Sequence, residues 1–246
     1  MSPLDDSRIA GTIAGNIQRI QEEIRRTATR AGRDPSTVQL VAATKTVSLS
    51  GLLEAYAAGV RVFGENRLQE AQEKMPAVGP RQGLTWHFIG RIQRRKLKDI
   101  VGKFGLIHSV ENVEQSRHIN ALAEKLGICQ DILLEVNVAR EDTKGGLFSQ
   151  DVPKAVEEIE RHPHVTLRGF MTLPPFAENA EEARPYFSEL RQLRDSLVQD
   201  GLVSGGVEAL SMGMSHDYQI AIEEGATMVR IGTAIFGKRG PIPKAG

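Results

Sequence analysis

The 246-residue sequence predicts an α/β fold, a single (β/α)8 TIM barrel with an extra N-terminal helix. Short apolar segments of strand length alternate with longer segments of helix length, and no linker-like stretch interrupts the alternation. The length of the chain also suits one barrel. We therefore expect one domain over residues 1–246, with an N-terminal helical region at 1–35 and a loose tail at 238–246.

The first expected element is an amphipathic helix from about Ser7 to Ala31, because isoleucines recur there at spacings of three and four residues. Gly32 and Pro35 then supply the signals that end a helix. Apolar runs of strand length follow along the rest of the chain. The expected strands are Val38–Thr44, Val60–Phe63, Thr85–Ile89, Leu106–Ser109, Ile132–Asn137, Thr166–Met171, Ala209–Ser211 and Met228–Ile231.

Between these runs lie segments whose apolar residues have helical spacing. The expected helices are Leu49–Ala58, Arg67–Met75, Arg95–Phe104, Val113–Leu126, Val152–Arg161, Ala180–Gln199 and Tyr218–Glu224. This strict alternation favours a closed barrel over an open sheet. In such a barrel the carboxyl ends of the strands meet at one face, where functional residues gather.

Two segments near the end of the chain indicate a phosphate group as ligand. Residues 210–217 have the pattern of a short strand, a turn carrying Ser215 and a short helix, and residues 228–237 that of an apolar strand ending in Gly232 and Thr233. The loops after the last two strands of a barrel commonly bind phosphate through backbone N–H groups. Glycine permits a close approach of the backbone, and the two hydroxyl groups add donors.

The first predicted strand ends in a lysine, Lys45, just before Ser48, which has the features of a helix N-cap. A lysine among apolar neighbours can lose its proton and attack carbonyl groups, although a strand-end lysine can equally be an ordinary residue of the barrel rim. A phosphate site combined with an amine is the pair of features that pyridoxal 5'-phosphate (PLP) requires.

These motifs resemble the YggS/PROSC family of pyridoxal phosphate homeostasis proteins. The matching segments span nearly the whole chain in one order, which makes the resemblance specific. They are Ala43-Thr44-Lys45-Thr46, Phe63-Gly64-Glu65-Asn66, Trp86-His87-Phe88-Ile89-Gly90, Arg168-Gly169-Phe170-Met171, Leu210-Ser211-Met212-Gly213-Met214-Ser215 and Met228 to Gly237. The resemblance implies a barrel like the alanine racemase N-terminal domain.

By its motif, the resemblance assigns to Lys45 the lysine that forms a Schiff base with PLP. It also implies phosphate contacts for Ser215, Gly232 and Thr233, with backbone N–H groups providing much of the binding. The alternatives are that Ser215 only begins the following helix and that the Gly-Thr pair only closes the last strand.

Arg230 lies two residues before Gly232, so both side-chain directions belong to one face of the strand. The resemblance implies that Arg230 faces the pyridine nitrogen of PLP. A guanidinium does not readily exchange a proton, so the ring would be a weak electron sink. The alternative is a salt bridge to Glu65, Glu135 or another carboxylate at a strand end.

Asn66 follows the second strand, where it can either hydrogen-bond near the cofactor ring or cap the helix from Arg67. We assign no catalytic role to His87, which has the features of a core histidine. Asn137 and the residues Lys144-Gly145-Gly146 match a family loop that either shields the cofactor or is only a polar turn.

The basic segment 91–98 is the strongest local concentration of charge, and a solvated loop with a first helical turn explains it better than a nucleic-acid site. Lysine plus arginine and aspartate plus glutamate each number 31, which gives no overall attraction to nucleic acid or membrane. No cluster of metal ligands is apparent. Ile92 and Arg95 stand where the family usually has leucine and asparagine.

Cys129 is the single cysteine, so no intrachain disulfide is expected, and we predict it to be a small buried residue. Without an apolar signal core or a membrane-spanning run, the sequence predicts a cytoplasmic protein.

Two main functions are open: a carrier or buffer that takes part in intracellular PLP (vitamin B6) homeostasis, and a PLP-dependent amino-acid racemase. A third, weaker alternative is a barrel that binds another phosphorylated metabolite. Alanine racemases add a β-rich second domain that completes the catalytic site across a dimer, and this sequence ends soon after the eighth predicted strand. A racemase also needs acid–base groups on both faces of the cofactor. We therefore expect a monomeric carrier with no catalytic residue, and PLP-dependent apo-enzymes as partners.

Overall fold

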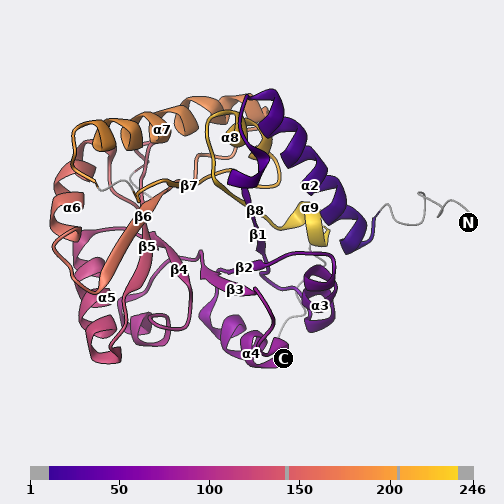
Figure 1. The fold of residues 1–246 in the computed structure, drawn as a ribbon, viewed down its shortest axis with the longest axis horizontal. Coiled ribbons are helices and arrows are strands. Elements are labelled where there is room, and N and C mark those ends of the chain that lie inside the picture. Colours follow the sequence, from indigo (N-terminus) through magenta and orange to yellow (C-terminus); the bar gives the residue numbers. More distant parts are fainter. Residues whose placement is uncertain (1–10, 142–143, 204–205, 238–246) are drawn as a thin grey trace, which may run out of the picture.

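The computed structural model describes residues 11–141, 144–203 and 206–237, and its strands form a closed, all-parallel barrel in the order β1 to β8 (Figure 1). The strands are β1 Gln39–Ala43, β2 Val62–Glu65, β3 Thr85–Phe88, β4 Leu106–Val110, β5 Gln130–Glu135, β6 Val165–Met171, β7 Ala209–Ser211 and β8 Met228–Ile231. The barrel closes where β1 pairs with β8, with Val41 opposite Arg230. The predicted fold class and all eight predicted strands are confirmed, with shifts of at most a few residues at their ends.

Helical segments surround the strands (Figure 1). The α-helices are α2 Ile13–Arg30, α3 Leu49–Ala57, α4 Leu68–Val78, α5 Val113–Leu126, α6 Val152–Ile159, α7 Arg184–Gln199, α8 Tyr218–Glu223 and α9 Thr233–Phe236. The 3-10 helices are η1 Pro35–Thr37, η2 Arg94–Asp99, η3 Ser149–Asp151 and η4 Ala180–Ala183. No helix within the described ranges is both long and apolar enough to cross a membrane.

The N-terminal helix α2 packs beside α8 and α9, next to the closure of the barrel (Figure 1). Its isoleucine stripe is buried at Ile17, Ile20 and Ile24, as the spacing predicts. The helix begins at Ile13, later than expected, because the Thr12 side chain accepts a hydrogen bond from the Gly15 N–H and so caps it. The predicted start at Ser7 and the predicted tail at 238–246 lie outside the described residues.

Two sequence predictions are wrong in detail. Residues 95–104 do not form an α-helix; the 3-10 helix η2 ends at Asp99 and the chain then turns through Gly102, whose φ is +78°. Cys129 is exposed rather than buried, and its Sγ lies 3.0 Å from Thr166 Oγ1. Strand β5 begins at the next residue, Gln130, and it is the Gln130 side chain that is buried.

Candidate functional site

A cavity of about 740 Å³ opens at the carboxyl ends of the strands. Its lining contains every predicted cofactor-binding residue, namely Lys45, Asn66, Ser215, Arg230, Gly232 and Thr233. They come from β1, β2, β7 and β8 or from the loops that follow these strands. Residues from distant parts of the sequence meet because parallel strands end at the same face of the barrel.

The backbone on both sides of Lys45 is held by a neighbouring helix. Lys74, on α4, donates from Nζ to the carbonyl of Thr44 at 2.7 Å, and Glu70 Oε2 accepts from the N–H of Thr46 at 2.7 Å. Thr46 has a φ of +63°, which is rare for a β-branched residue. The polar contacts from α4 therefore fix a strained turn directly after Lys45.

These contacts continue into the barrel wall through Glu65, which is fully buried. Its Oε1 accepts from Thr44 Oγ1 at 2.6 Å and from Lys74 Nζ at 2.9 Å. Burial raises the pKa of Glu65, and the hydrogen bonds from Thr44 and Lys74 oppose the rise. Sequence reading missed Lys74, for which the only signal was its spacing of four residues from Glu70 on a helix.

We expect Lys74→Met to destabilise the protein by about 2 to 4 kcal/mol, because it leaves the buried Glu65 carboxylate without its counter-ion. Urea denaturation measures the loss. Lys154→Met on the exposed face of α6 is the control, with an expected change below about 0.5 kcal/mol. Equal effects of the two substitutions would show that the network around Lys45 does not stabilise the fold.

Arg230 is buried, with 5% of its surface exposed, and lines the cavity from β8. Its Nη1 donates to Ser211 Oγ at 2.6 Å and its Nη2 to the Thr172 carbonyl at 2.9 Å. Burial lowers the pKa of Arg230 to about 10. Within the described residues it makes no ion pair with Glu65 or Glu135, so the predicted salt-bridge alternative is not observed.

Behind Arg230, a chain of hydrogen bonds crosses the interior of the barrel. His108 Nδ1 lies 2.9 Å from Ser211 Oγ, and His108 Nε2 lies 2.9 Å from His87 Nδ1. Strands β4 and β7 are not neighbours in the barrel, so the contact between His108 and Ser211 must pass through its centre. Sequence reading missed this role for His87 and His108.

The position of each hydrogen along these hydrogen bonds follows from Arg230, which can only donate. Ser211 Oγ accepts from Arg230, so its own hydrogen is available to His108 Nδ1, which leaves the His108 hydrogen on Nε2 to donate to His87. Burial lowers the pKa of His87 to about 4 and that of His108 well below its ordinary value. Both imidazoles are therefore neutral, and the hydrogen bonds orient Arg230 without adding charge beside it.

Ser215 links the loops that follow β7 and β8. Its Oγ accepts from the N–H groups of Gly232 and Ala234, at 3.3 and 3.2 Å. Helix α8 begins only at Tyr218, with Asp217 as its N-cap, so Ser215 does not serve as the cap of that helix. Both N–H groups thus point at Ser215 Oγ, and Ser215 and Thr233, which each carry a hydroxyl group, line the cavity together.

Asn66 lines the cavity just before α4. The N-cap of α4 is Arg67, without a side-chain capping hydrogen bond, so the predicted capping role of Asn66 is not observed. His216, which sequence reading did not select, also lines the cavity; its Nε2 lies 3.1 Å from the Glu178 carbonyl and its ring lies against Phe176.

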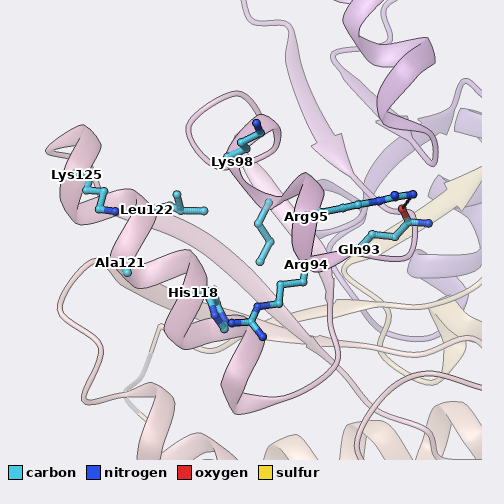
Figure 2. A pocket seen from close by; sticks show the side chains of 9 residues that line it. Gln93, Arg94, Arg95, Lys98, His118, Ala121, Leu122 and Lys125 are labelled. Carbon is cyan, nitrogen blue, oxygen red and sulfur yellow. Dashed lines mark hydrogen bonds between the residues drawn. The ribbon is translucent and has the colours of Figure 1, made fainter.

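The basic segment lies on the outer surface, beside a separate groove between η2 and α5 (Figure 2). Arg94, Arg95 and Lys98 come from η2, and His118 and Lys125 from α5. None of the predicted site residues lines this groove. Arg94 also pairs with Glu114 at 3.3 Å, which agrees with a solvated, ion-paired surface. The described residues contain no cluster suited to a metal ion.

Glu135, at the end of β5, is a further buried carboxylate at this face, with 8% of its surface exposed. Burial raises its pKa to about 7, and the nearby Glu111 carboxylate adds to the rise, while Arg230 and Arg91 oppose it. An acid whose pKa is raised by folding stabilises the fold below its unfolded pKa of 4.5 and loses that contribution as the pH rises through 7.

We therefore expect the stability gained by Glu135→Gln relative to wild type to be about 2 kcal/mol larger at pH 8, where the wild-type carboxylate is ionised, than at pH 5. Urea denaturation at the two pH values measures the difference. Glu157→Gln, on the exposed face of α6, should follow the wild type at both. A constant difference between Glu135→Gln and wild type would show that this carboxylate does not titrate with folding.

Comparison with known proteins identifies the family of this chain. The family described as alanine racemase, N-terminal domain, matches residues 15–240. A pyridoxal phosphate homeostasis protein of Aquifex aeolicus is 45% identical over 91% of this chain and 96% of its own. The protein of the same name from Escherichia coli is 34% identical over 92% of this chain and 97% of its own.

Solved structures extend the likeness. PipY of Synechococcus elongatus, solved with PLP bound, has a TM-score of 0.77 at 33% identity, covering 87% of this chain and all of its own. An alanine racemase of Clostridium difficile shares the fold, with a TM-score of 0.72 at 15% identity, over 94% of this chain and 58% of the racemase. The chain therefore belongs to the alanine racemase N-terminal domain family and, within it, to the pyridoxal phosphate homeostasis proteins.

Proposed function

We propose that this protein binds PLP as a Schiff base on Lys45 and takes part in PLP homeostasis in the cytoplasm, as a carrier or buffer rather than a catalyst. It would act as a monomeric, single-domain barrel that supplies PLP-dependent apo-enzymes. One observation carries the proposal: an amine, two hydroxyl groups with adjacent backbone N–H groups, and a buried guanidinium line the same cavity.

The donors in the cavity fit each part of the cofactor. The hydroxyl groups of Ser215 and Thr233 are suited to a phosphate group, and the N–H groups of Gly232 and Ala234 hold Ser215 in place by donating to its Oγ. Lys45 supplies the amine for the aldehyde, and Asn66 supplies an amide that can hydrogen-bond beside the ring. The cavity volume of about 740 Å³ lies within the range for small-molecule sites.

Arg230 supports the carrier function over catalysis. When bound, PLP supplies an electrophilic carbon and a ring that can withdraw electrons most strongly if its nitrogen is protonated. A guanidinium facing that nitrogen donates a hydrogen bond but does not transfer its proton. Ser211 and Thr172 hold the guanidinium in place, so the residues of this chain favour retention of the cofactor over carbanion chemistry.

The second candidate function is that of an amino-acid racemase, and one observation favours it. A racemase needs a proton-transfer group on each face of the cofactor, and His216 lines the cavity in addition to Lys45. However, His216 Nε2 already lies 3.1 Å from the Glu178 carbonyl. The carrier therefore remains the proposed function.

Two assays on the PLP-loaded protein test the proposal. When it is mixed with the apo-form of a PLP-dependent enzyme, the activity of that enzyme should return faster than PLP dissociates from the loaded protein in buffer alone. Incubation with L-alanine in heavy water should produce neither D-alanine nor exchange of the α-proton above the rate with free PLP. Racemisation at enzyme-like rates, lost in His216→Ala, would replace the carrier with the racemase.

A further inference from the structure

A second, smaller cavity of about 240 Å³ adjoins the first at the carboxyl ends of the strands. Ile89 and Leu173 line both cavities, so the two spaces share walls. The remaining walls are largely apolar, with Val136, Met171 and Pro174 among them. The polar or charged side chains in the lining are Arg91, Ser109, Glu111, Glu135, Asn137 and Lys144.

Most of these polar groups are already engaged. Arg91 pairs with Glu111 at 3.2 Å, and Lys144 pairs with Glu141 at 3.0 Å. The Asn137 side-chain amide donates to the Glu141 carbonyl and accepts from the Glu141 N–H. The Ser109 hydroxyl donates to the Gly90 carbonyl. The two cations and the two neutral groups therefore have partners within the protein.

Glu135 is the exception. It lines the cavity with 8% of its surface exposed, and among the described residues its carboxylate makes neither a hydrogen bond nor an ion pair, so its oxygens keep contact with the cavity. Arg230 and Arg91 influence it only through space, while Glu111 repels it. A buried carboxylate without a partner is costly, so this cavity is suited to a ligand that carries the missing donors and positive charge.

The loop after β5 is shaped to enclose this carboxylate. Gly146 has a φ of +97°, and a Cβ atom there would meet the Glu135 carbonyl at 2.9 Å and its Cγ at 3.1 Å. A Cβ atom on Gly145 would meet Glu111 Oε1 at 2.2 Å. At Gly146 both the positive φ and the contact with the Glu135 carbonyl require glycine, so the loop can pack closely over the end of β5.

We propose that this side cavity binds a small primary aliphatic ammonium compound, with the Glu135 carboxylate as its counter-ion and the apolar walls around its alkyl stem. A metal ion fits less well because Glu111 is committed to Arg91, which leaves one carboxylate where a cation site needs several oxygen ligands. An anion fits less well because both cations of the lining are paired.

This inference rests on the proposed function in one respect: an ammonium compound held there would lie beside the cavity that holds the cofactor's aldehyde. Primary amines compete with a lysine for such an aldehyde, so the side cavity would be the place where an amine that removes the cofactor first binds. Burial raises the pKa of Glu135 to about 7, and a bound cation would lower that pKa by favouring the ionised form, so the ammonium compound should bind best above pH 7.

The test uses cofactor-free protein and n-butylammonium chloride, followed by NMR chemical shifts at pH 8. We expect saturable binding with a Kd of about 1 to 10 mM, weakened at least tenfold in Glu135→Gln, unchanged in Glu157→Gln, and absent for n-butanol. Equal affinity in wild type and Glu135→Gln, or no saturation by about 100 mM, would overturn the proposal.

A second measurement separates this inference from the proposed function. In PLP-loaded protein, the rate at which n-butylamine removes the visible band should level off at high concentration in wild type and rise linearly in Glu135→Gln. A linear rise in wild type would overturn the link to the cofactor. If no visible band forms while the cofactor-free protein still binds n-butylammonium, the proposed function fails and the side cavity remains an ammonium site.

Discussion

Lys45→Ala is expected to abolish the visible absorbance band that the wild-type protein acquires with PLP. The reason is chemical: the band requires a Schiff base, and Lys45, which follows β1, lines the same cavity as the proposed phosphate-binding residues. Absorbance at equal protein and PLP concentrations measures the effect. Because the proposed phosphate contacts of Ser215 and the last loop would remain, the variant should still bind PLP, with an affinity lower by about two orders of magnitude or more.

The control for this substitution is Lys74→Met, which removes a different lysine close to the same segment. That variant is expected to be less stable but to retain the visible band once it is saturated with PLP, since its amine contacts Thr44, Glu65 and Glu70 rather than the cavity. A wild-type spectrum in Lys45→Ala would show that the covalent bond forms elsewhere.

Arg230→Gln should weaken PLP binding about 10- to 100-fold, because it would remove the proposed charge-assisted hydrogen bond to the ring nitrogen, which is worth about 1.5 to 3 kcal/mol. The fold should tolerate the change to within about 1 kcal/mol, since the guanidinium is desolvated and, among the described residues, has no ion-pair partner. Fluorescence or absorbance titration gives the affinity, and urea denaturation gives the stability.

Two further variants make the Arg230 result specific. Arg230→Lys keeps the charge but not the planar pair of donors to Ser211 and Thr172, so we expect an intermediate loss of affinity. Ser211→Ala leaves Arg230 in place but breaks its link to His108, and should weaken binding less than Arg230→Gln does. Unchanged affinity in Arg230→Gln would mean that the guanidinium does not contact the cofactor.

The sequence predicted well those features that depend on local pattern. Each short apolar run became a strand, and polar residues directly after the runs, such as Lys45 and Asn66, reached one cavity because parallel strands share an end. The resemblance to a known family supplied the roles of individual residues. Segment 95–104 failed because its apolar spacing resembles a helix, while Gly102 turns the chain at a positive φ.

Features that depend on distant contacts could not be predicted in this way. The contact between His108 and Ser211 joins strands that are neighbours neither in sequence nor in the barrel wall. Lys74, on helix α4, donates to the Thr44 carbonyl beside Lys45 across 30 residues of sequence. Likewise, Glu135 has the pattern of an ordinary strand-end carboxylate until the packing of the loop after β5 shows that it is enclosed without a partner.

The central claim is that PLP is bound covalently through Lys45, and borohydride reduction tests it most directly. The PLP-loaded protein is reduced and digested, and the modified peptide is identified by mass spectrometry. We predict loss of the visible band and a single reduced pyridoxyl adduct on Lys45. An adduct on another lysine, or none in a protein that shows the visible band, would contradict the account.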